Sequence, residues 1–159
     1  MDLVVFTVYL LACMAAAATG SLFPPGEWWK SLRKPWFTPP DIVFPLAWMA
    51  IYTMSAVAAA RVADETGNAL PMALWALQIA LNTLWSPVFF GLHRPRASVV
   101  IVTSLWVTVV ATCVAFFPLD PVAGWLMVPY IVWLTVASGL NIGVIILNPN
   151  EGRAATPAE

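Results

Sequence analysis

The sequence predicts an all-α integral membrane protein, a bundle of five transmembrane helices. Of its 159 residues, 61% are hydrophobic and only 9% are Asp, Glu, Lys or Arg, whereas a soluble domain usually carries about 25% charged residues. Such a composition argues against a soluble globular enzyme and against a disordered chain. A net charge of −1 without a long basic cluster also argues against a nucleic-acid binder.

Five apolar stretches have the length of a membrane-spanning helix, which needs about 20 residues. They cover residues 3–22, 42–62, 70–90, 97–117 and 122–147. We expect them to form one domain over residues 1–150, followed by a polar tail at residues 151–159. The first stretch lacks the basic segment of a secretory signal, since Asp2 is the only charge ahead of it, and we expect a retained helix. All five runs are continuous and too long for the alternating strands of a membrane β-barrel.

The basic residues are divided unequally between the two ends of the predicted bundle. The loops after the first and third spans share a side with the C-terminus, and this side holds Lys30, Arg33, Lys34, Arg94, Arg96 and Arg153. The opposite side holds only Arg61. For an inner or plasma membrane, the positive-inside rule places the first and third loops and the C-terminus in the cytosol. The sequence leaves open whether the membrane is an inner or an outer one.

Amide and hydroxyl groups, but no charges, occupy the middle of the predicted spans, which argues against a proton pump or an ion-coupled transporter. Gln78, Asn82 and Ser86 recur every four residues on one face of the third span, and Asn141 lies in the fifth. A buried amide in hydrocarbon needs a hydrogen-bond partner. These amides therefore either join neighbouring helices or serve as a polar anchor in a ligand pocket.

Aromatic side chains share faces with these polar groups. Trp48 and Tyr52 lie on one face of the second span, and Trp133, Ala137 and Asn141 on one face of the fifth. If both faces meet the amide face of the third span, the bundle encloses an aromatic chamber suited to a flat, hydrophobic, polycyclic ligand. The other tryptophans that we assign to the membrane interface or the lipid-facing surface are Trp28, Trp29, Trp75, Trp106 and Trp125.

The longest connection, residues 23–41, is rich in proline, and we expect a structured lid over one mouth of the bundle. Pairs of small residues four positions apart occur at Ala76 and Ala80 in the third span and at Gly139 and Gly143 in the fifth. Such pairs support close helix contacts within a bundle or between protomers. A homodimer is therefore expected.

No residues have the spacing of a metal site. Cys13 and Cys113 are isolated in different spans and are expected to be core residues, and His93 is the only histidine. The sequence therefore predicts no metal and no required cofactor.

Four segments in order resemble the tryptophan-rich sensory protein family, TspO/MBR, whose animal members are the mitochondrial translocator proteins. They are KPWFTPP (Lys34–Pro40), VFPLAWMAIY (Val43–Tyr52), QIALNTLWSPVFFG (Gln78–Gly91) and VPYIVWLTVASGLN (Val128–Asn141). The resemblance covers nearly the whole chain. It implies a five-helix bundle, commonly dimeric in bacteria, that binds porphyrins such as protoporphyrin IX or haem between the helices beneath the first loop.

The resemblance also extends the candidate site. The spacing of the residues already selects Trp48, Tyr52, Asn82, Trp133, Ala137 and Asn141. Carried over by position, the family's pocket adds Trp36 and Phe44 near the lid, with Phe89, Phe90 and Leu140 as nearby lining. Sterol is a less favoured ligand, because Tyr130 has no Lys or Arg within the next five positions to complete the L/V-x-Y-x-K/R pattern of the animal proteins.

Three ligand-dependent functions remain open, besides that of a structural membrane bundle that binds no ligand. The leading one is a bacterial membrane receptor or sensor that binds porphyrin and regulates a tetrapyrrole or stress response. The second is light-dependent breakdown of porphyrin, with Trp48 and Trp133 as electron donors and with the chemistry residing in the ligand. The third is transport of porphyrin or another hydrophobic molecule across the membrane.

Overall fold

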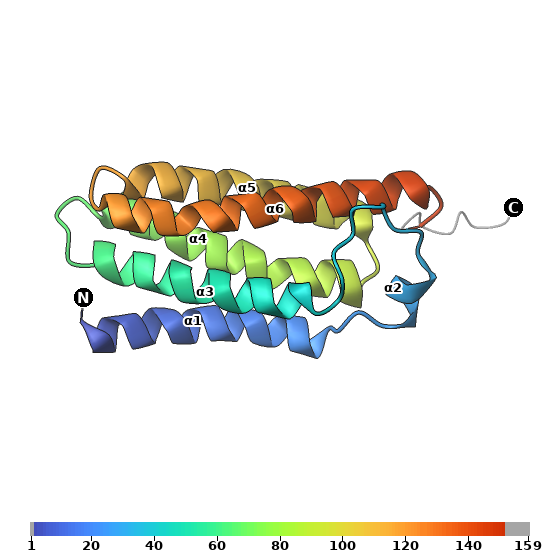
Figure 1. The fold of residues 1–159 in the computed structure, drawn as a ribbon, viewed down its shortest axis with the longest axis horizontal. Helices are drawn as coiled ribbons and strands as arrows, with labels where there is room; N and C mark the ends of the chain where they lie inside the picture. Colours follow the sequence, from blue (N-terminus) through green and yellow to red (C-terminus); the bar gives the residue numbers. More distant parts are fainter. Residues whose placement is uncertain (1, 152–159) are drawn as a thin grey trace, which may run out of the picture.

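The computed structural model describes residues 2–151, most of which lie in five long helices (Figure 1). These five helices are long and apolar enough to cross a membrane, and all regular secondary structure in the described part of the chain is helical. The predicted fold class is therefore confirmed. Residues 152–159, which include Arg153 and most of the expected polar tail, lie outside the described residues.

The helices follow one another with short connections. In chain order they are α1 (Leu3–Leu22), α2 (Glu27–Ser31), α3 (Val43–Val62), α4 (Ala69–Ser86), the π-helical segment η1 (Pro87–Gly91), α5 (Pro95–Phe116) and α6 (Pro121–Leu147). Both α5 and α6 begin with a proline, which suits the first helical position because no hydrogen bond is lost there. For this reason α5 begins two residues earlier than the sequence predicts.

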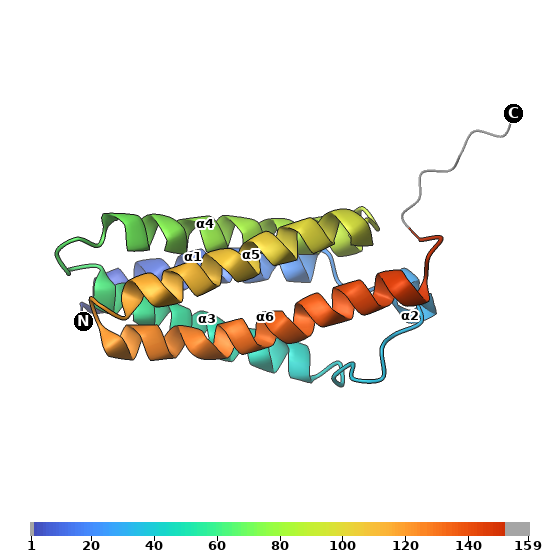
Figure 2. The same ribbon diagram turned by 90° about the horizontal axis from the view of Figure 1, so that it is seen from above.

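The five long helices form a closed ring. Helix α3 packs against α1 and α6, while α4 packs against α1 and α5, and the α5–α6 contact completes the ring. Figures 1 and 2 show the long helices side by side along one axis, with α2 and the C-terminal end of α6 at the same end of the bundle. The ring arrangement leaves its interior as the place where a cavity can form.

The outer surface of the bundle is apolar. Large hydrophobic side chains such as Leu11, Val107 and Val132 are exposed on three different helices. In water such a surface would be costly, but lipid tails are as apolar as these side chains. The exposed surface therefore fits an integral membrane protein.

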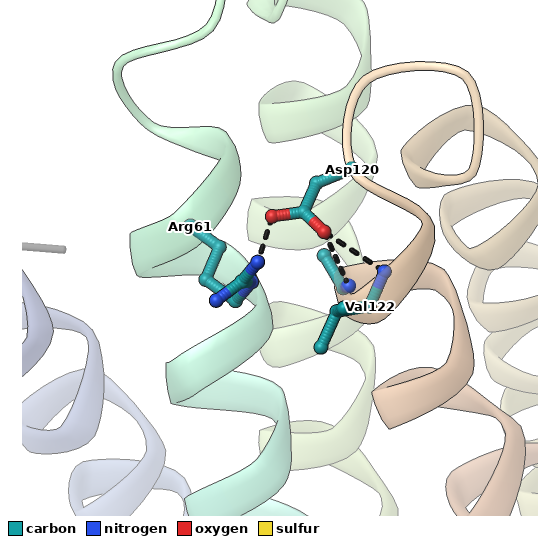
Figure 3. A network of polar contacts seen from close by, with 4 residues as sticks. Arg61, Asp120 and Val122 are labelled. Atoms are coloured by element: carbon teal, nitrogen blue, oxygen red, sulfur yellow. Dashed lines mark hydrogen bonds and ion pairs between the residues drawn. The ribbon is translucent and has the colours of Figure 1, made fainter.

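At the end opposite α2, an ion pair ties α3 to the start of α6 (Figure 3). Arg61 donates from Nε to Asp120 Oδ2 at 2.7 Å, while Asp120 Oδ1 accepts from the backbone N–H groups of Val122 and Ala123. Burial raises the pKa of Asp120, but the bonds from Arg61 and from the two backbone groups outweigh it and hold the pKa below its ordinary value. Asp120 thus acts both as the N-cap of α6 and as a link between helices.

The connection between α1 and α3 folds against the C-terminal end of α6. Asn148 forms two hydrogen bonds with the backbone of Arg33, accepting from its N–H at 3.0 Å and donating to its carbonyl at 2.9 Å. Trp28 in α2 donates from Nε1 to Glu151 at 2.9 Å. This segment is therefore held in place at several points, and its role as a lid stays a prediction.

The glycine pair in α6 lies beneath this same segment. A Cβ atom at Gly143 would overlap Pro35, and one at Gly139 would lie 3.6 Å from the ring of Phe37. The nearest neighbours of this glycine pair thus belong to the proline-rich connection, and its use between protomers stays a prediction. The missing side chains let the proline-rich connection lie directly on α6.

Candidate ligand-binding site

A cavity of about 440 Å³ lies inside the helical ring, at the end covered by the α1–α3 connection. Side chains from all five long helices, from α2 and from η1 line it. Its volume falls in the range of about 300–1,000 Å³ that is usual for small-molecule sites.

Most of the candidate residues come together around this cavity. Those that line it are Phe44, Trp48, Tyr52, Asn82, Phe89, Phe90, Trp133, Ala137, Leu140 and Asn141. The faces that the sequence places on α3, α4 and α6 therefore do converge. Ligand binding by these residues stays a prediction.

Trp36 is the exception among the candidates. Its side chain is 95% exposed and does not line the cavity. Its aromatic neighbour is Phe37, with ring centroids 5.8 Å apart. Because the preceding Pro35 is buried where it would meet any side chain at Gly143, the chain directs Trp36 outwards. The expectation that Trp36 forms part of the cavity wall is therefore wrong for this structure.

The aromatic wall is built around Trp48. Its indole stacks on Tyr52 with ring centroids 5.2 Å apart and meets Trp133 edge to face at 6.4 Å. Phe44 adds an edge-to-face contact with Trp133 at 5.4 Å. Such offset and edge-to-face pairs hold large aromatic rings rigidly. The wall is therefore preorganised to stack against a flat molecule.

One amide faces the cavity with hydrogen-bonding capacity to spare. Asn82 donates from Nδ2 to the phenolic oxygen of Tyr52 at 2.8 Å. Its Oδ1 accepts no hydrogen bond from the described residues, and the Tyr52 hydroxyl still has its own proton to donate. Together the two residues present an acceptor and a donor to a ligand.

The other amide in the cavity wall is occupied by its neighbours. Asn141 hydrogen-bonds the buried hydroxyl of Ser98 in α5. With the oxygen and nitrogen of its side-chain amide exchanged, Asn141 also donates from Nδ2 to the carbonyl of Pro95 at 2.9 Å and accepts at Oδ1 from Trp85 Nε1 at 3.2 Å. Asn141 therefore links α6 to α5, whereas Asn82 links α4 to α3 and keeps its Oδ1 without a partner among the described residues.

Gln78 does not share this position, although its spacing places it on the Asn82 face of α4. Ser86 lines the cavity, whereas Gln78 is completely buried away from it. Neither amide atom of Gln78 has a hydrogen-bond partner within the described residues. The polar face of α4 therefore meets the cavity only over its C-terminal half.

A proline-induced change of helix geometry places two wall residues. Pro87 has no N–H to continue the α-helical pattern, and the chain continues as the π-helical segment η1. Within η1, Phe89 stacks on Trp85 with ring centroids 5.1 Å apart, and Phe90 meets Phe89 edge to face at 4.8 Å. These rings close the wall on the α4 side.

Sequence reasoning missed several wall residues. Trp85 follows Asn82 by three positions, so helical spacing could have identified it. Trp29, which the sequence assigns to the interface or the lipid-facing surface, reaches the cavity from α2, and no periodic signal predicts this.

Trp75 also differs from its assignment to the interface or the lipid-facing surface. It is buried in the core and donates from Nε1 to Ser55 at 3.0 Å.

The wall of the cavity is almost free of charged side chains among the described residues. Asp41 at the edge of the cavity is its one charged residue among those described. In the same part of the chain, no group of three or more His, Cys, Asp or Glu side chains is placed to hold a metal ion. The site therefore offers stacking surfaces together with the acceptor of Asn82 and the donor of Tyr52.

Comparison with known proteins agrees with this architecture. The TspO/MBR family model matches residues 6–147. The chain is 46% identical to Protein CrtK of Rhodobacter capsulatus over 155 residues, covering 95% of this chain and 97% of that protein. It is 47% identical to a tryptophan-rich sensory protein of Cereibacter sphaeroides over 154 residues, covering 97% and 98%.

An animal relative matches at lower identity. The human translocator protein is 31% identical over 141 residues, covering 84% of this chain and 83% of that protein. The family match, the five apolar helices and the near-complete coverage lead to one conclusion. The chain belongs to the TspO/MBR family of membrane sensory and translocator proteins.

Proposed function

We propose that this protein is a membrane receptor that binds porphyrins, such as protoporphyrin IX or haem, in the cavity inside the bundle. The observation that carries the proposal is the wall formed by Trp48, Tyr52 and Trp133 around a cavity of about 440 Å³, with the Asn82 amide in the same wall. Broad aromatic rings gain both burial and stacking energy against indole faces. Asn82 Oδ1 and the Tyr52 hydroxyl are suited to hydrogen-bond a carboxyl group at the edge of the macrocycle.

The position of the site supports a regulatory role. Trp29 lines the cavity, and its helix α2 is joined through Trp28 to Glu151 at the end of α6. A ligand that presses on Trp29 would therefore alter the surface at this end of the bundle. The name of the Cereibacter relative, a tryptophan-rich sensory protein, supports a sensory role.

The orientation is part of the same proposal. The end that carries α2 holds Lys30 in α2, Arg33 and Lys34 after it, Arg94 before α5 and Arg96 in the first turn of α5, whereas Arg61 lies near the opposite end, at the C-terminus of α3 (Figure 1). We propose that the α2 end faces the cytosol. A reporter that is active only on the outer side of the membrane, fused after residue 151, should be inactive. Activity of this fusion would contradict the orientation.

The experiment that tests porphyrin binding is a titration of the protein in lipid nanodiscs, followed by the porphyrin absorption spectrum. Saturable spectral change is expected for the wild type, and weaker binding for Asn82→Leu and Trp133→Leu. Trp125→Phe is the matched control, because Trp125 is exposed and lies outside the cavity. Absence of saturation, or equal affinity in all four proteins, would contradict the proposed site.

Light-dependent porphyrin breakdown is a second candidate, favoured by the placement of Trp48. Its ring lies within 6.4 Å of Tyr52, Tyr130 and Trp133, measured between ring centroids. An indole in such a cluster could donate an electron to a photo-excited macrocycle. Illumination of the complex tests this, and equal bleaching in wild type and a Trp48→Phe, Trp133→Phe double variant would contradict it.

Transport is the third candidate, and the name of the human relative, translocator protein, is what favours it. Liposomes loaded with a porphyrin-binding reporter protein would reveal transport as uptake that depends on the membrane protein. At saturating porphyrin, uptake equal to that of reporter-loaded liposomes without the membrane protein would contradict transport.

We also propose a homodimer. Ala76 and Ala80 are exposed on α4, whereas Gly139 and Gly143 lie beneath the α1–α3 connection, so the alanine pair is the small-residue motif available to a second copy. An Ala76→Leu, Ala80→Leu double variant is expected to shift the protein to monomer in a cross-linking assay. An unchanged dimer fraction would show that this face is not used.

A further inference from the structure

We infer that hydrophobic ligands reach the cavity sideways from the bilayer, through an opening between the C-terminal half of α1 and the N-terminal half of α3. The ligand class is a flat, apolar molecule dissolved in the lipid. This inference rests on the proposed use of the cavity as a binding site and concerns the route by which the site is filled.

The exposure of the wall residues locates the opening. Among all residues that line the cavity, those with exposed side chains are Met14, Ser21, Pro25, Asp41, Pro45 and Met49. Each belongs to α1, to α3 or to their connection. The wall residues from α4, η1, α5 and α6 are all buried or half-buried. The cavity is therefore closed on those sides and open on one.

Two methionines mark the part of this opening that faces the lipid. Met14 on α1 is 42% exposed and Met49 on α3 is 63% exposed, and both also line the cavity. The other residues of α1 that line the cavity are all small: Ala16, Ala17, Gly20 and Ser21. Small residues leave space between the helices, and unbranched methionine side chains can move aside at low cost.

The other half of the same helix pair is tightly packed. Ala56 and Ala59 of α3 are completely buried in one core cluster with Cys13 of α1, and Phe6 and Tyr9 pack against that cluster. The two helices are thus in close contact over one half and separated by the cavity over the other. Lateral access is confined to the half of the membrane nearest the α1–α3 connection.

The alternative route, past the α1–α3 connection, is obstructed. Asn148 holds the backbone of Arg33 with two hydrogen bonds, and Trp28 is bonded to Glu151. Pro35 lies directly over Gly143. Opening this end would break all of these contacts, whereas the lateral path needs only the movement of two methionine side chains. A ligand arriving from the lipid also never crosses water.

Binding kinetics distinguish the two routes. In one variant, Met49→Cys, the thiol is labelled with a bulky maleimide. The native Cys13 and Cys113 are buried, so labelling falls on the introduced thiol. Val107→Cys, labelled in the same way, is the matched control, because Val107 is exposed on α5 and does not line the cavity. Protoporphyrin IX added to nanodiscs is the probe, and stopped-flow measurement of tryptophan quenching gives its association and dissociation rates.

We expect the label at position 49 to slow association and dissociation together, each by at least about tenfold. The label at position 107 should change neither rate. A second variant, Asn148→Ala, releases the α1–α3 connection and should also leave the association rate unchanged. Faster association in Asn148→Ala, or unaltered rates with the label at position 49, would overturn the lateral route. Absence of saturable binding in the unlabelled wild type would instead overturn the proposed function.

Discussion

Asn82 donates a hydrogen bond from Nδ2 to the phenolic oxygen of Tyr52 at 2.8 Å, which joins α4 to α3 at the wall of the cavity. The bond fixes the orientation of the amide and leaves Oδ1 free of partners among the described residues. It also fixes the ring of Tyr52, on which Trp48 stacks. One polar contact thus positions both the hydrogen-bonding group and the aromatic wall of the candidate site.

Replacement of Asn82 by Leu is expected to weaken protoporphyrin IX binding about tenfold, which corresponds to about 1.4 kcal/mol and is the size of a typical net hydrogen bond. Tyr52→Phe keeps the stacked ring and should reduce affinity by less. Isothermal titration in nanodiscs measures both. A larger loss for Tyr52→Phe than for Asn82→Leu would show that the hydroxyl, not the amide, is the anchor.

Gly143→Ala is expected to displace the α1–α3 connection, because its Cβ would overlap Pro35. Overpacking of this kind costs about 1–3 kcal/mol. The variant should unfold at lower temperature and be cleaved faster by protease within residues 23–41. Gly139→Ala is the matched control, since its Cβ would lie at an ordinary contact distance of 3.6 Å from Phe37. Equal protease resistance in the two variants would contradict the predicted packing.

The Arg61–Asp120 pair is expected to make stability depend on pH in the acid range. The pKa of Asp120 in the folded protein lies below its ordinary value, so its stabilising contribution is present above the unfolded pKa of about 3.9. The contribution is lost as the pH falls through the folded pKa. Because Arg61 is partly exposed, we expect less than about 1 kcal/mol.

Thermal unfolding of wild type and Asp120→Asn between pH 7 and pH 3 measures this contribution. The variant keeps a side chain that can cap α6 but loses the charge. It should be less stable at pH 7 and approach the wild type at the acid end. Two curves that stay parallel over the whole range would show that Asp120 makes no such contribution.

Trp75 is expected to matter for stability but not for the ligand. Its Nε1 donates to the buried hydroxyl of Ser55, and its ring contacts Tyr9 edge to face at 4.9 Å. Trp75→Phe removes the bond and leaves Ser55 without it, at a cost of about 1–3 kcal/mol. Thermal unfolding should show this loss, while porphyrin affinity stays unchanged. A selective loss of affinity in this variant would place Trp75 in the site after all.

Much of the candidate site follows from helical spacing because the spans are regular. Trp48 with Tyr52, and Trp133 with Ala137, are four residues apart, and a helix places such pairs on one face whatever surrounds it. Spacing alone does not say which helix faces meet. It assigns both Trp75 and Trp29 to the membrane interface or the lipid-facing surface. The structure buries Trp75 against Ser55 and brings Trp29 to the cavity.

Composition and hydropathy predict the membrane location and the five spans, because 61% hydrophobic and 9% charged residues suit lipid rather than water. Which residues cover each helix face depends on the packing of the helices and their connections. Trp36 turns outwards and Gly143 receives Pro35, because the α1–α3 connection folds back on α6 through contacts between residues more than 100 positions apart. Such contacts depend on the packing of the whole ring and leave no periodic trace along the chain.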